Sequence, residues 1–460
     1  MASSTLLRMV PCNGCNGVVS ANRTSNSHKP WAGSRIRFTT TRKWKAAGGS
    51  SIRAGSSTCG NAVSDKSRTS PWLMLPPSIE DGDNSITYNF YSLAEDKVHK
   101  INNNKSQSSE VKPELPEKYV GSNSRGWLAL SNPTKGEQFL YNPISDRRIN
   151  LPSIEAGDDN AISKLIISDD DEEEQDFRVM IIHHSLQKLA FCRPAAAAAA
   201  AEWTTIGEPF IFLDDKYFER AYEDIVYSAA HKLFFCVTCF GDFEAWNLQN
   251  PENPRSIPIT LSADKKNFPW GSAGRLDEAL LKRDCHSIKY LVVSEHDNRL
   301  FLIRRFICDQ MYPGGHGKVK SNNEMMITYR TMSFDVHEIE REKGEMRYME
   351  TSLDGLAMFI GVNHGFAIHV NAAKGKLKPN CIYFTDAKEY TTPYWDKDSP
   401  YGGHDIGIFD YVERDFSPCF YPIEERCFTV NQIFMPGRSG ADKIKRIVPP
   451  PMWFNPPPLV

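Results

Sequence analysis

This chain of 460 residues is 40% hydrophobic and 24% charged, with 54 Lys and Arg against 57 Asp and Glu. That composition is typical of a globular protein and excludes collagen-like and wholly disordered chains. The apolar stretches fall short of the roughly 18 residues that a membrane-spanning helix needs, so we expect no membrane span.

The first sixty residues differ in charge from the rest of the chain. They contain nine basic residues and no acidic one, and the first carboxylate is that of Asp65. The remainder has 45 basic and 57 acidic residues, a net charge of −12. A body this acidic repels phosphate backbones, so we expect no nucleic-acid partner.

Residues 1–54 are predicted to be an organellar transit peptide, since they are basic, rich in Ser and Thr, and free of acid. The opening Met1–Ser4 and the tract Ile52–Ala54 resemble a plastid transit peptide and its processing site. The basic stretch Arg35–Lys45 suits a mitochondrial signal equally well, so chloroplast and mitochondrion both stay open. The alternative is an ordinary disordered basic tail. A linker is expected to follow over residues 55–86.

Eleven Cys residues scattered over the chain argue against a disulfide framework. One CxxC pair, Cys12 and Cys15, lies in the predicted transit peptide. The other pair, Cys236 and Cys239, lies in an apolar stretch, Leu233–Phe240, that reads as a strand. Positions three apart on a strand face opposite sides of a sheet, so we expect two reduced thiols that share neither a bond nor a metal.

The body from residue 87 to 456 shows short apolar runs separated by Gly, Pro, Asn and Asp, which is typical of antiparallel meanders. One short helix is expected over 277–282. So many strands exceed one sandwich, and we predict an all-β protein: a β-propeller of six or seven four-stranded antiparallel blades, without a strict repeat. The expected strands are Trp127–Leu130, Phe139–Tyr141, Ile149–Leu151, Ile225–Tyr227, Leu233–Cys239, Phe243–Leu248, Tyr290–Val293, Leu300–Ile307, Met326–Ile339, Leu356–Val362, Phe366–Val370, Cys381–Phe384 and Ile406–Phe409.

Two low-complexity tracts interrupt this pattern. The acidic run Ser168–Asp176 lacks the glycine and the spaced ligands of a calcium loop, and we interpret it as a solvated insertion. The alanine run Ala195–Ala201 favours helix locally but lies between strand-like segments, so we interpret it as a loop without chemistry.

Several strings together resemble the plant domain-of-unknown-function 295 family, a KIB-type β-propeller often joined to an F-box. That family's pattern is a Gly-Ser…Gly-Trp-Leu strand, an Asn-Pro turn and a Leu-Pro ending, followed by C-terminal hallmarks. The matching strings are Tyr119–Leu130, Tyr141–Pro143, Ile149–Pro152, Asn380–Asp386, Gly402–Asp410 and Pro449–Pro456.

The resemblance implies a β-propeller that belongs to an organellar branch without the ubiquitin-ligase link. Leu75-Pro76 is followed by strand-like sequence rather than by an F-box, and a transit-peptide composition precedes it. One departure lies in Glu345–Ser352, where the family often has a Trp and this chain has only Tyr348. The register of that blade is therefore open.

These motifs also have structural interpretations. Gly126 permits close packing before Trp127, and the indole is expected to fill a gap between blades. Gly402 and Gly403 suit a turn with positive φ, and Asp405 is expected to accept hydrogen bonds from that turn's amides. The prolines of the last motif cannot donate backbone hydrogen bonds, so that segment belongs at the chain's exit or on a sheet edge.

No catalytic or metal-binding residue is predicted. His404 and Asp405 are neighbours on a turn, where side chains diverge, and His183-His184 should place one imidazole on the core side and one in solvent. Neither pair has the spacing of a metal triad, and no phosphate loop or nucleophile elbow occurs.

We therefore predict a non-catalytic protein-interaction module of a plant organelle, a monomer without cofactor, whose partner and binding residues are unknown. Two alternatives stay open. One is a ubiquitin-ligase substrate adaptor whose F-box is missing or unrecognised. The other is an enzyme whose site is scattered around the propeller channel.

Overall fold

A computed structural model of the chain divides it into two compact units, Met1–Ser67 and Arg68–Val460. All described residues lie in the second unit and contain no α-helix, and accordingly no helix among them is long and apolar enough to cross a membrane. The described residues are 70–79, 86–103, 118–123, 126–132, 135–154, 162–168, 177–183, 188–194, 202–208, 210–213, 216–259, 285–310, 328–370, 377–386, 403–421, 447 and 449–456.

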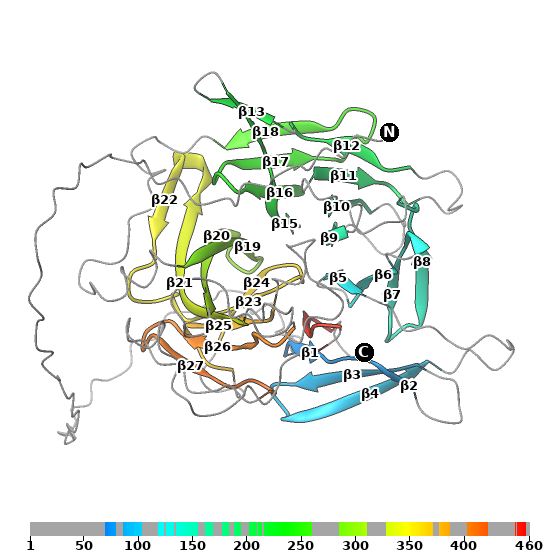
Figure 1. Cartoon of the computed structure of the whole chain (residues 1–460), viewed down its shortest axis with the longest axis vertical. Helices are drawn as coiled ribbons and strands as arrows, with labels where there is room; N and C mark the ends of the chain where they lie inside the picture. The colour runs from blue at the N-terminus through cyan, green and yellow to red at the C-terminus, as the bar shows by residue number, and fades with distance from the viewer. Residues whose placement is uncertain are drawn as a thin grey trace, which may run out of the picture. The chain divides into compact units, whose positions relative to one another are not determined.

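Three sheets are built alike, each from four antiparallel strands that follow one another in sequence (Figure 1). The first strand of each sheet lies against the first strand of the next, so these strands line the inside of a ring. We name these sheets blades 2, 3 and 4. Their strands are β5 (Lys118–Ser122), β6 (Leu128–Asn132), β7 (Glu137–Asn142) and β8 (Arg147–Asn150); β9 (Ile162–Ile167), β10 (Val179–His183), β11 (Lys188–Cys192) and β12 (Thr204–Ile206); and β15 (Tyr222–Ser228), β16 (Leu233–Thr238), β17 (Phe243–Asn247) and β18 (Arg255–Ile259).

A nine-stranded sheet contains blades 5 and 6, which are joined by one parallel bridge between Val293 and Phe366. Blade 6 departs from the antiparallel pattern, because β23 and β25 run parallel. The strands of blade 5 are β19 (His286–Ser294), β20 (Arg299–Gln310), β21 (Thr328–Glu340) and β22 (Glu345–Tyr348), and those of blade 6 are β24 (Phe366–His369), β23 (Leu356–Ile360), β25 (Cys381–Phe384), β26 (Gly407–Asp410) and β27 (Asp415–Ser417).

Blade 1 closes the ring with strands from both ends of the chain. Its β1 lies between β3 and β28, so a segment near residue 72 pairs with one near residue 453. The linker expected over 55–86 therefore overlaps the propeller, which begins at Trp72. The strands of blade 1 are β1 (Trp72–Met74), β2 (Ser78–Ile79), β3 (Ile86–Ser92), β4 (Lys97–Asn103) and β28 (Met452–Phe454).

The all-β propeller prediction is confirmed, and the sheets formed by the described residues make six blades. The last family motif forms β28 at the edge of blade 1, as expected. Its prolines flank the strand, so they are not needed as backbone donors between strands. A separate hairpin of β13 (Phe210–Leu213) and β14 (Lys216–Glu219) pairs with no blade in the described part of the chain. Several predictions concern residues outside the described ones. These are the helix over 277–282, the acidic tract after Ser168, the alanine tract Ala195–Ala201, and the pair Cys12 and Cys15.

A repeat appears in the turns rather than in the strands. In blade 2 the Tyr141 hydroxyl donates to Asp146 at 3.1 Å, and in blade 1 the Tyr91 hydroxyl donates to Asp96 at 2.7 Å. Both aspartates have positive φ, near +50°, where most residues are disfavoured but Asp and Asn are tolerated. Blades 1 and 2 thus share a turn conformation and a Tyr–Asp hydrogen bond.

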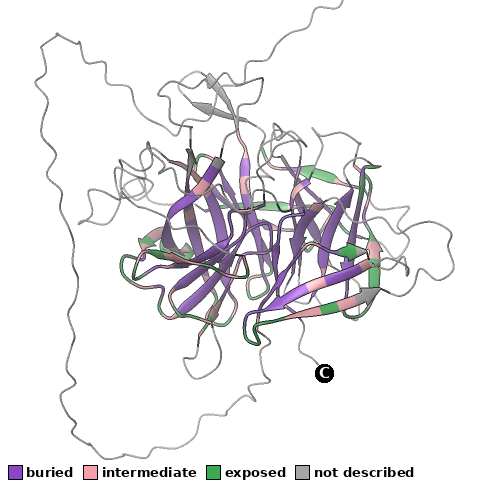
Figure 2. Cartoon of the chain, turned by 60° about the horizontal axis from the view of Figure 1, so that its bottom comes forward, coloured by how far each residue is buried: buried purple, intermediate pink, exposed green. Residues whose placement is uncertain are grey.

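The core lies between neighbouring blades, where most strand residues are buried (Figure 2). Trp127 is half-buried and packs against the cluster between blades 2 and 3, close to the place that its motif predicts. Cys236 lies in the core between blades 3 and 4, and burial raises the pKa of its thiol. The strand ends at Thr238, so Cys239 is a turn residue rather than a strand position, and neither Cys236 nor Cys239 is in a disulfide. The register of blade 5 is settled, since Tyr348 lies opposite His337.

Candidate functional site

The segment Gly361–Gly365 connects β23 and β24 and contacts several other blades. The Gly365 carbonyl accepts a hydrogen bond from the Val293 amide of blade 5 at 3.1 Å. Nε2 of His364 lies 2.7 Å from the Tyr227 carbonyl of blade 4, and Val362 packs into the cluster between blades 1 and 2. We call this segment the central plug, because it contacts four blades besides its own.

The plug's glycines are required by close approach. A Cβ on Gly365 would lie 2.0 Å from the Leu291 carbonyl oxygen, which belongs to the backbone and cannot move aside. A Cβ on Gly361, whose φ is +156°, would lie 2.0 Å from Oγ1 of Thr385. Only glycine lets the chain turn this tightly against its neighbours.

Beside the plug, Asp224 joins the inner strands of three blades. Its carboxylate accepts the Leu291 amide hydrogen bond at 2.7 Å and forms a very short ion pair with Lys164. Burial raises the pKa of the Asp224 carboxyl above its ordinary value, and the Lys164 ammonium opposes that rise. The inner wall is therefore held together by a buried charge pair as well as by apolar packing.

A second buried charge pair links blades 5 and 6. The side chains of Arg305 and Asp405 are 0% and 1% exposed, and Nη2 lies 3.0 Å from Oδ2. The guanidinium also donates to Oγ1 of Thr331 at 2.7 Å and to the Thr385 carbonyl at 2.6 Å. The Asp405 carboxylate was expected to accept amides of its own turn; it also accepts the Thr331 amide of blade 5 at 2.8 Å, a bond that the sequence did not predict.

His404 and Asp405 face different partners. The His404 ring lies 4.8 Å from the Tyr329 ring, and its Nδ1 lies 3.8 Å from Oδ2 of Asp386. The Tyr329 hydroxyl donates to the same Asp386 carboxylate at 2.6 Å. These side chains pack into a buried junction rather than forming a dyad with Asp405.

The other histidine pair is only partly described. His183 ends β10, half-buried and opposite Ile162, while His184 lies outside the described residues. Within the described ranges, no group of three or more His, Cys, Asp and Glu side chains is placed to hold a metal ion.

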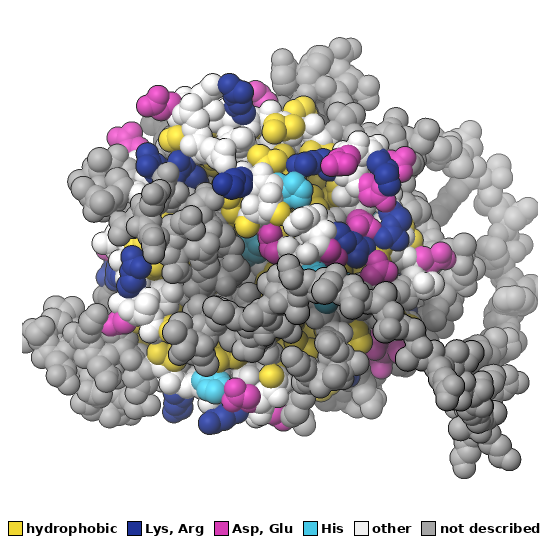
Figure 3. Space-filling model, turned by 180° about the vertical axis from the view of Figure 1, so that it is seen from behind, with side chains coloured by type: hydrophobic (Ala, Val, Ile, Leu, Met, Phe, Trp, Pro, Cys, Tyr) yellow, Lys and Arg dark blue, Asp and Glu magenta, His cyan; other side chains and the backbone are white. Residues whose placement is uncertain are grey.

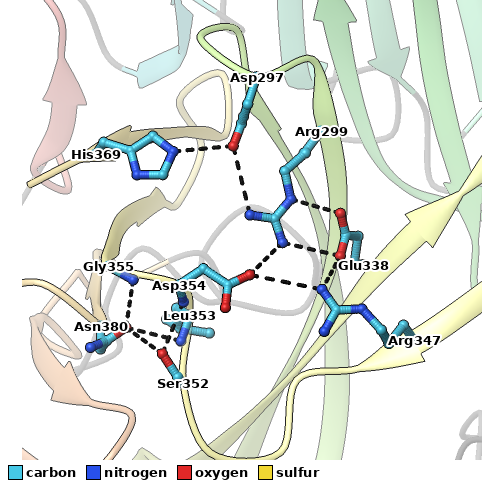
Figure 4. A network of polar contacts seen from close by, with 10 residues as sticks. All are labelled: Asp297, Arg299, Glu338, Arg347, Ser352, Leu353, Asp354, Gly355, His369 and Asn380. Atoms are coloured by element: carbon cyan, nitrogen blue, oxygen red, sulfur yellow. Dashed lines mark hydrogen bonds and ion pairs between the residues drawn. The ribbon is translucent and has the colours of Figure 1, made fainter. Parts of the chain in front are cut away.

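Blades 5 and 6 are also joined on the surface, by a network that we call the turn-face network (Figure 4). It consists of six charged or titratable side chains from the β19–β20 turn and from four other segments. In it, Arg299 binds Glu338 at 2.6 Å and Asp354 at 2.7 Å. The full set is Asp297, Arg299, Glu338, Arg347, Asp354 and His369.

Asp354 is held in place by the Asn380 side chain from the family motif. The Asn380 carbonyl oxygen accepts from the Leu353 amide at 3.0 Å and from the Gly355 amide at 2.9 Å. These bonds fix the turn on both sides of Asp354, whose own φ is +55°. The carboxylate is therefore presented in one position.

Glu338 is ionised in this network, which is partly open to solvent. Burial opposes ionisation of Glu338, but hydrogen bonds from Arg299 and Arg347 hold the pKa of its carboxyl below the ordinary value. Its outer members are accessible, with Arg347 51%, Asp354 47% and His369 41% exposed. On the face that Figure 3 shows, basic and acidic side chains are interspersed. The arrangement can present fixed charges of both signs to a partner.

Sequence reasoning found neither the plug nor the turn-face network. The plug has a local signal, two glycines four residues apart between apolar runs, but that signal is common. The network has none, since Asp297, Glu338 and Asp354 lie on separate segments that only the sheet order brings together.

The fold and its contacts define a β-propeller. The family model described as KIB1-4 beta-propeller matches residues 90–410, and the chain belongs to that family. No curated protein matches the sequence.

Solved propellers resemble the chain only distantly. A DUF4221 family member from Bacteroides vulgatus is 9% identical, over 73% of this chain and 92% of that one, with a TM-score of 0.32. The β-propeller domain of Myceliophteria thermophila Cps50 (Swd1) is 8% identical, over 61% of this chain and 89% of that one, with a TM-score of 0.28. The WD40 domain of SCAP from fission yeast is 10% identical, over 62% of this chain and 64% of that one, with a TM-score of 0.28.

Proposed function

We propose that the chain is a non-catalytic protein-interaction module of a plant organelle, in the organellar branch of the domain-of-unknown-function 295 family. The observation that carries the proposal is the central plug. Propeller enzymes place their residues around the channel, and here the backbone and the buried side chains of Gly361–Gly365 are bonded to and packed against the surrounding blades. The buried charge pairs nearby are engaged in joining blades.

The turn-face network is the contact surface that we propose for a protein partner. Its carboxylates and guanidiniums are held in position by mutual hydrogen bonds, so little side-chain entropy is lost when a partner binds. Fixed charges of both signs favour a partner with the complementary pattern and disfavour others. Arg347 and Asp354 are the most exposed members and would make first contact.

Proximity labelling in the organelle tests this function. A labelling enzyme fused after Val460 should mark a defined set of proteins with the parent chain and lose that set with Arg347→Glu/Asp354→Arg. Arg255→Glu, on the exposed outer strand of blade 4, is the matched control and should keep the set. Labelling that is identical for all three variants contradicts the proposed surface. Recovery of ubiquitin-ligase subunits in every case would favour the adaptor alternative.

The organelle is part of the proposal and rests on the composition of residues 1–54. Fusing residues 1–70 to a fluorescent protein should direct it to chloroplasts or mitochondria. Diffuse cytosolic or nuclear fluorescence contradicts the transit-peptide interpretation without bearing on the interaction surface.

A further inference from the structure

The ring is closed by very short strands. β1 pairs over three residues with β28 on one side and over three residues with β3 on the other. In blade 5, by contrast, β20 pairs with β21 along the whole stretch Phe301–Gln310. Within the described residues β28 has β1 as its only sheet partner, and a hydrogen bond from the Ser122 hydroxyl to the Trp453 carbonyl is its further tie to blade 2.

The N-terminal and C-terminal segments leave the paired strands β1 and β28 at the same end of the pair. Trp72, the first residue of β1, lies opposite Phe454, the last residue of β28. A force that draws the two ends apart therefore acts on one residue pair at a time, beginning with this pair. Sequential rupture of single pairs needs less force than shearing a whole ladder at once.

Loss of β1 would affect packing on both sides of blade 1. Its Trp72 and Met74 lie in the cluster shared with blade 2, and its Leu73 lies in the cluster shared with blade 6. That second cluster contains the fully buried Trp453 of β28, whose ring is 5.1 Å from Phe359. Withdrawing one three-residue strand would thus remove the partner of β28 and open both neighbouring interfaces.

We propose that β1 is the release strand of the propeller: traction on the N-terminal segment withdraws it and opens the ring at blade 1. The source of this traction would be import into an organelle, so the inference rests on the proposed organellar function. Translocation requires an unfolded chain and pulls it by its N-terminal end. β1 is the described strand nearest the N-terminus, so among the described strands the pulling force reaches it first. Processing must then leave β1 intact, since the mature ring needs it to close.

Single-molecule force measurement on the full chain, with handles at Met1 and Val460, tests the release strand. The variant Met74→Cys/Met452→Cys joins two residues that lie opposite each other in β1 and β28. In the reduced state we expect a first unfolding step at low force that releases blade 1. In the oxidised state that step should disappear, and the parent chain with and without oxidant is the control.

A second variant covers the case in which the cross-link does not form. Trp453→Ala should lower the force of the first step, whereas Ile257→Ala, at an exposed position of blade 4, should leave it unchanged. A first step that does not release blade 1 in the reduced state, or an unchanged first step in Trp453→Ala, would overturn the proposal. Neither measurement involves an organelle, so the release strand can fail while the targeting proposal stands, and the reverse.

Discussion

Blades 5 and 6 are joined by two charged networks, and burial distinguishes them. The Arg305–Asp405 pair is sealed from solvent, and its donors are met by Thr331 and by a backbone carbonyl. The turn-face network joins the same blades with its outer members about half exposed (Figure 4). A buried charge that loses its partner keeps its full desolvation cost, whereas an exposed one is rehydrated. The buried Arg305–Asp405 pair can therefore only stabilise the fold. The turn-face network can tolerate substitution or bind a partner.

Breaking the buried pair should have the largest effect. Asp405→Ala leaves the Arg305 guanidinium buried without its carboxylate, and we expect a loss of about 3–5 kcal/mol in the free energy of unfolding. Adding Arg305→Met should recover much of that loss, because the double variant has no buried charge. Chemical denaturation measures both. A loss below about 1 kcal/mol for Asp405→Ala would show that water reaches the site.

A methyl group in the plug should be the next most damaging change. Gly365→Ala places its Cβ against the Leu291 carbonyl oxygen, and the resulting overpacking should cost about 2–3 kcal/mol. Gly355→Ala is the matched control, since nothing lies within 4 Å of its Cβ and only its positive φ, +78°, is unfavourable. Thermal melts should rank Gly365→Ala clearly below Gly355→Ala. Equal melting temperatures would mean that the central plug shifts to accommodate the added methyl group at little cost.

The half-buried indole of Trp127 should matter less than a core tryptophan. A fully buried Trp loses about 3–5 kcal/mol on replacement by Ala, and we expect about 2 kcal/mol for Trp127→Ala, because part of its ring faces solvent and Arg147. Trp453→Ala, in the sealed core, supplies the upper reference in the same melts. If Trp127→Ala melts like the parent and loses a partner, its indole belongs to a binding surface.

Neutralising the surface network should have the smallest effect on stability. Glu338→Gln should cost about 1 kcal/mol at neutral pH, because the ion pairs are partly hydrated. The pKa of Glu338 is lowered in the folded chain, so its stabilisation is present above the unfolded pKa and is lost as pH falls through the folded pKa. The difference between parent and variant should shrink on acidification. A difference that stays constant down to acidic pH would contradict this role of the carboxylate.

The fold was predictable from the sequence because its signals are local. Apolar runs such as Leu233–Cys239 and Leu356–Val362, separated by turn residues, mark strands and hence an all-β ring. Blade 1 was not predictable in the same way, since Trp72–Met74 is too short to stand out and pairs with residues about 380 positions away. The expected linker was misplaced for that reason.

The interaction surface could not be predicted. Asn380 was recognised as part of a motif, but its task, fixing the turn around Asp354, depends on the parallel pairing of β23 and β25. For Asp405 the sequence suggested only bonds within its own turn, and its ion-pair partner Arg305 lies 100 residues away. Long-range pairing decides both cases.

The central claim is that the exposed network binds a partner while the buried pair holds the blades together. The most direct measurement is the affinity of the purified Arg347→Glu variant for the partner identified by proximity labelling, below the melting temperature. We predict that binding weakens about tenfold or more, equivalent to about 1.4 kcal/mol, while the folded protein loses no more than about 1 kcal/mol of stability. Unchanged affinity, or a loss that appears only together with unfolding, would contradict the account.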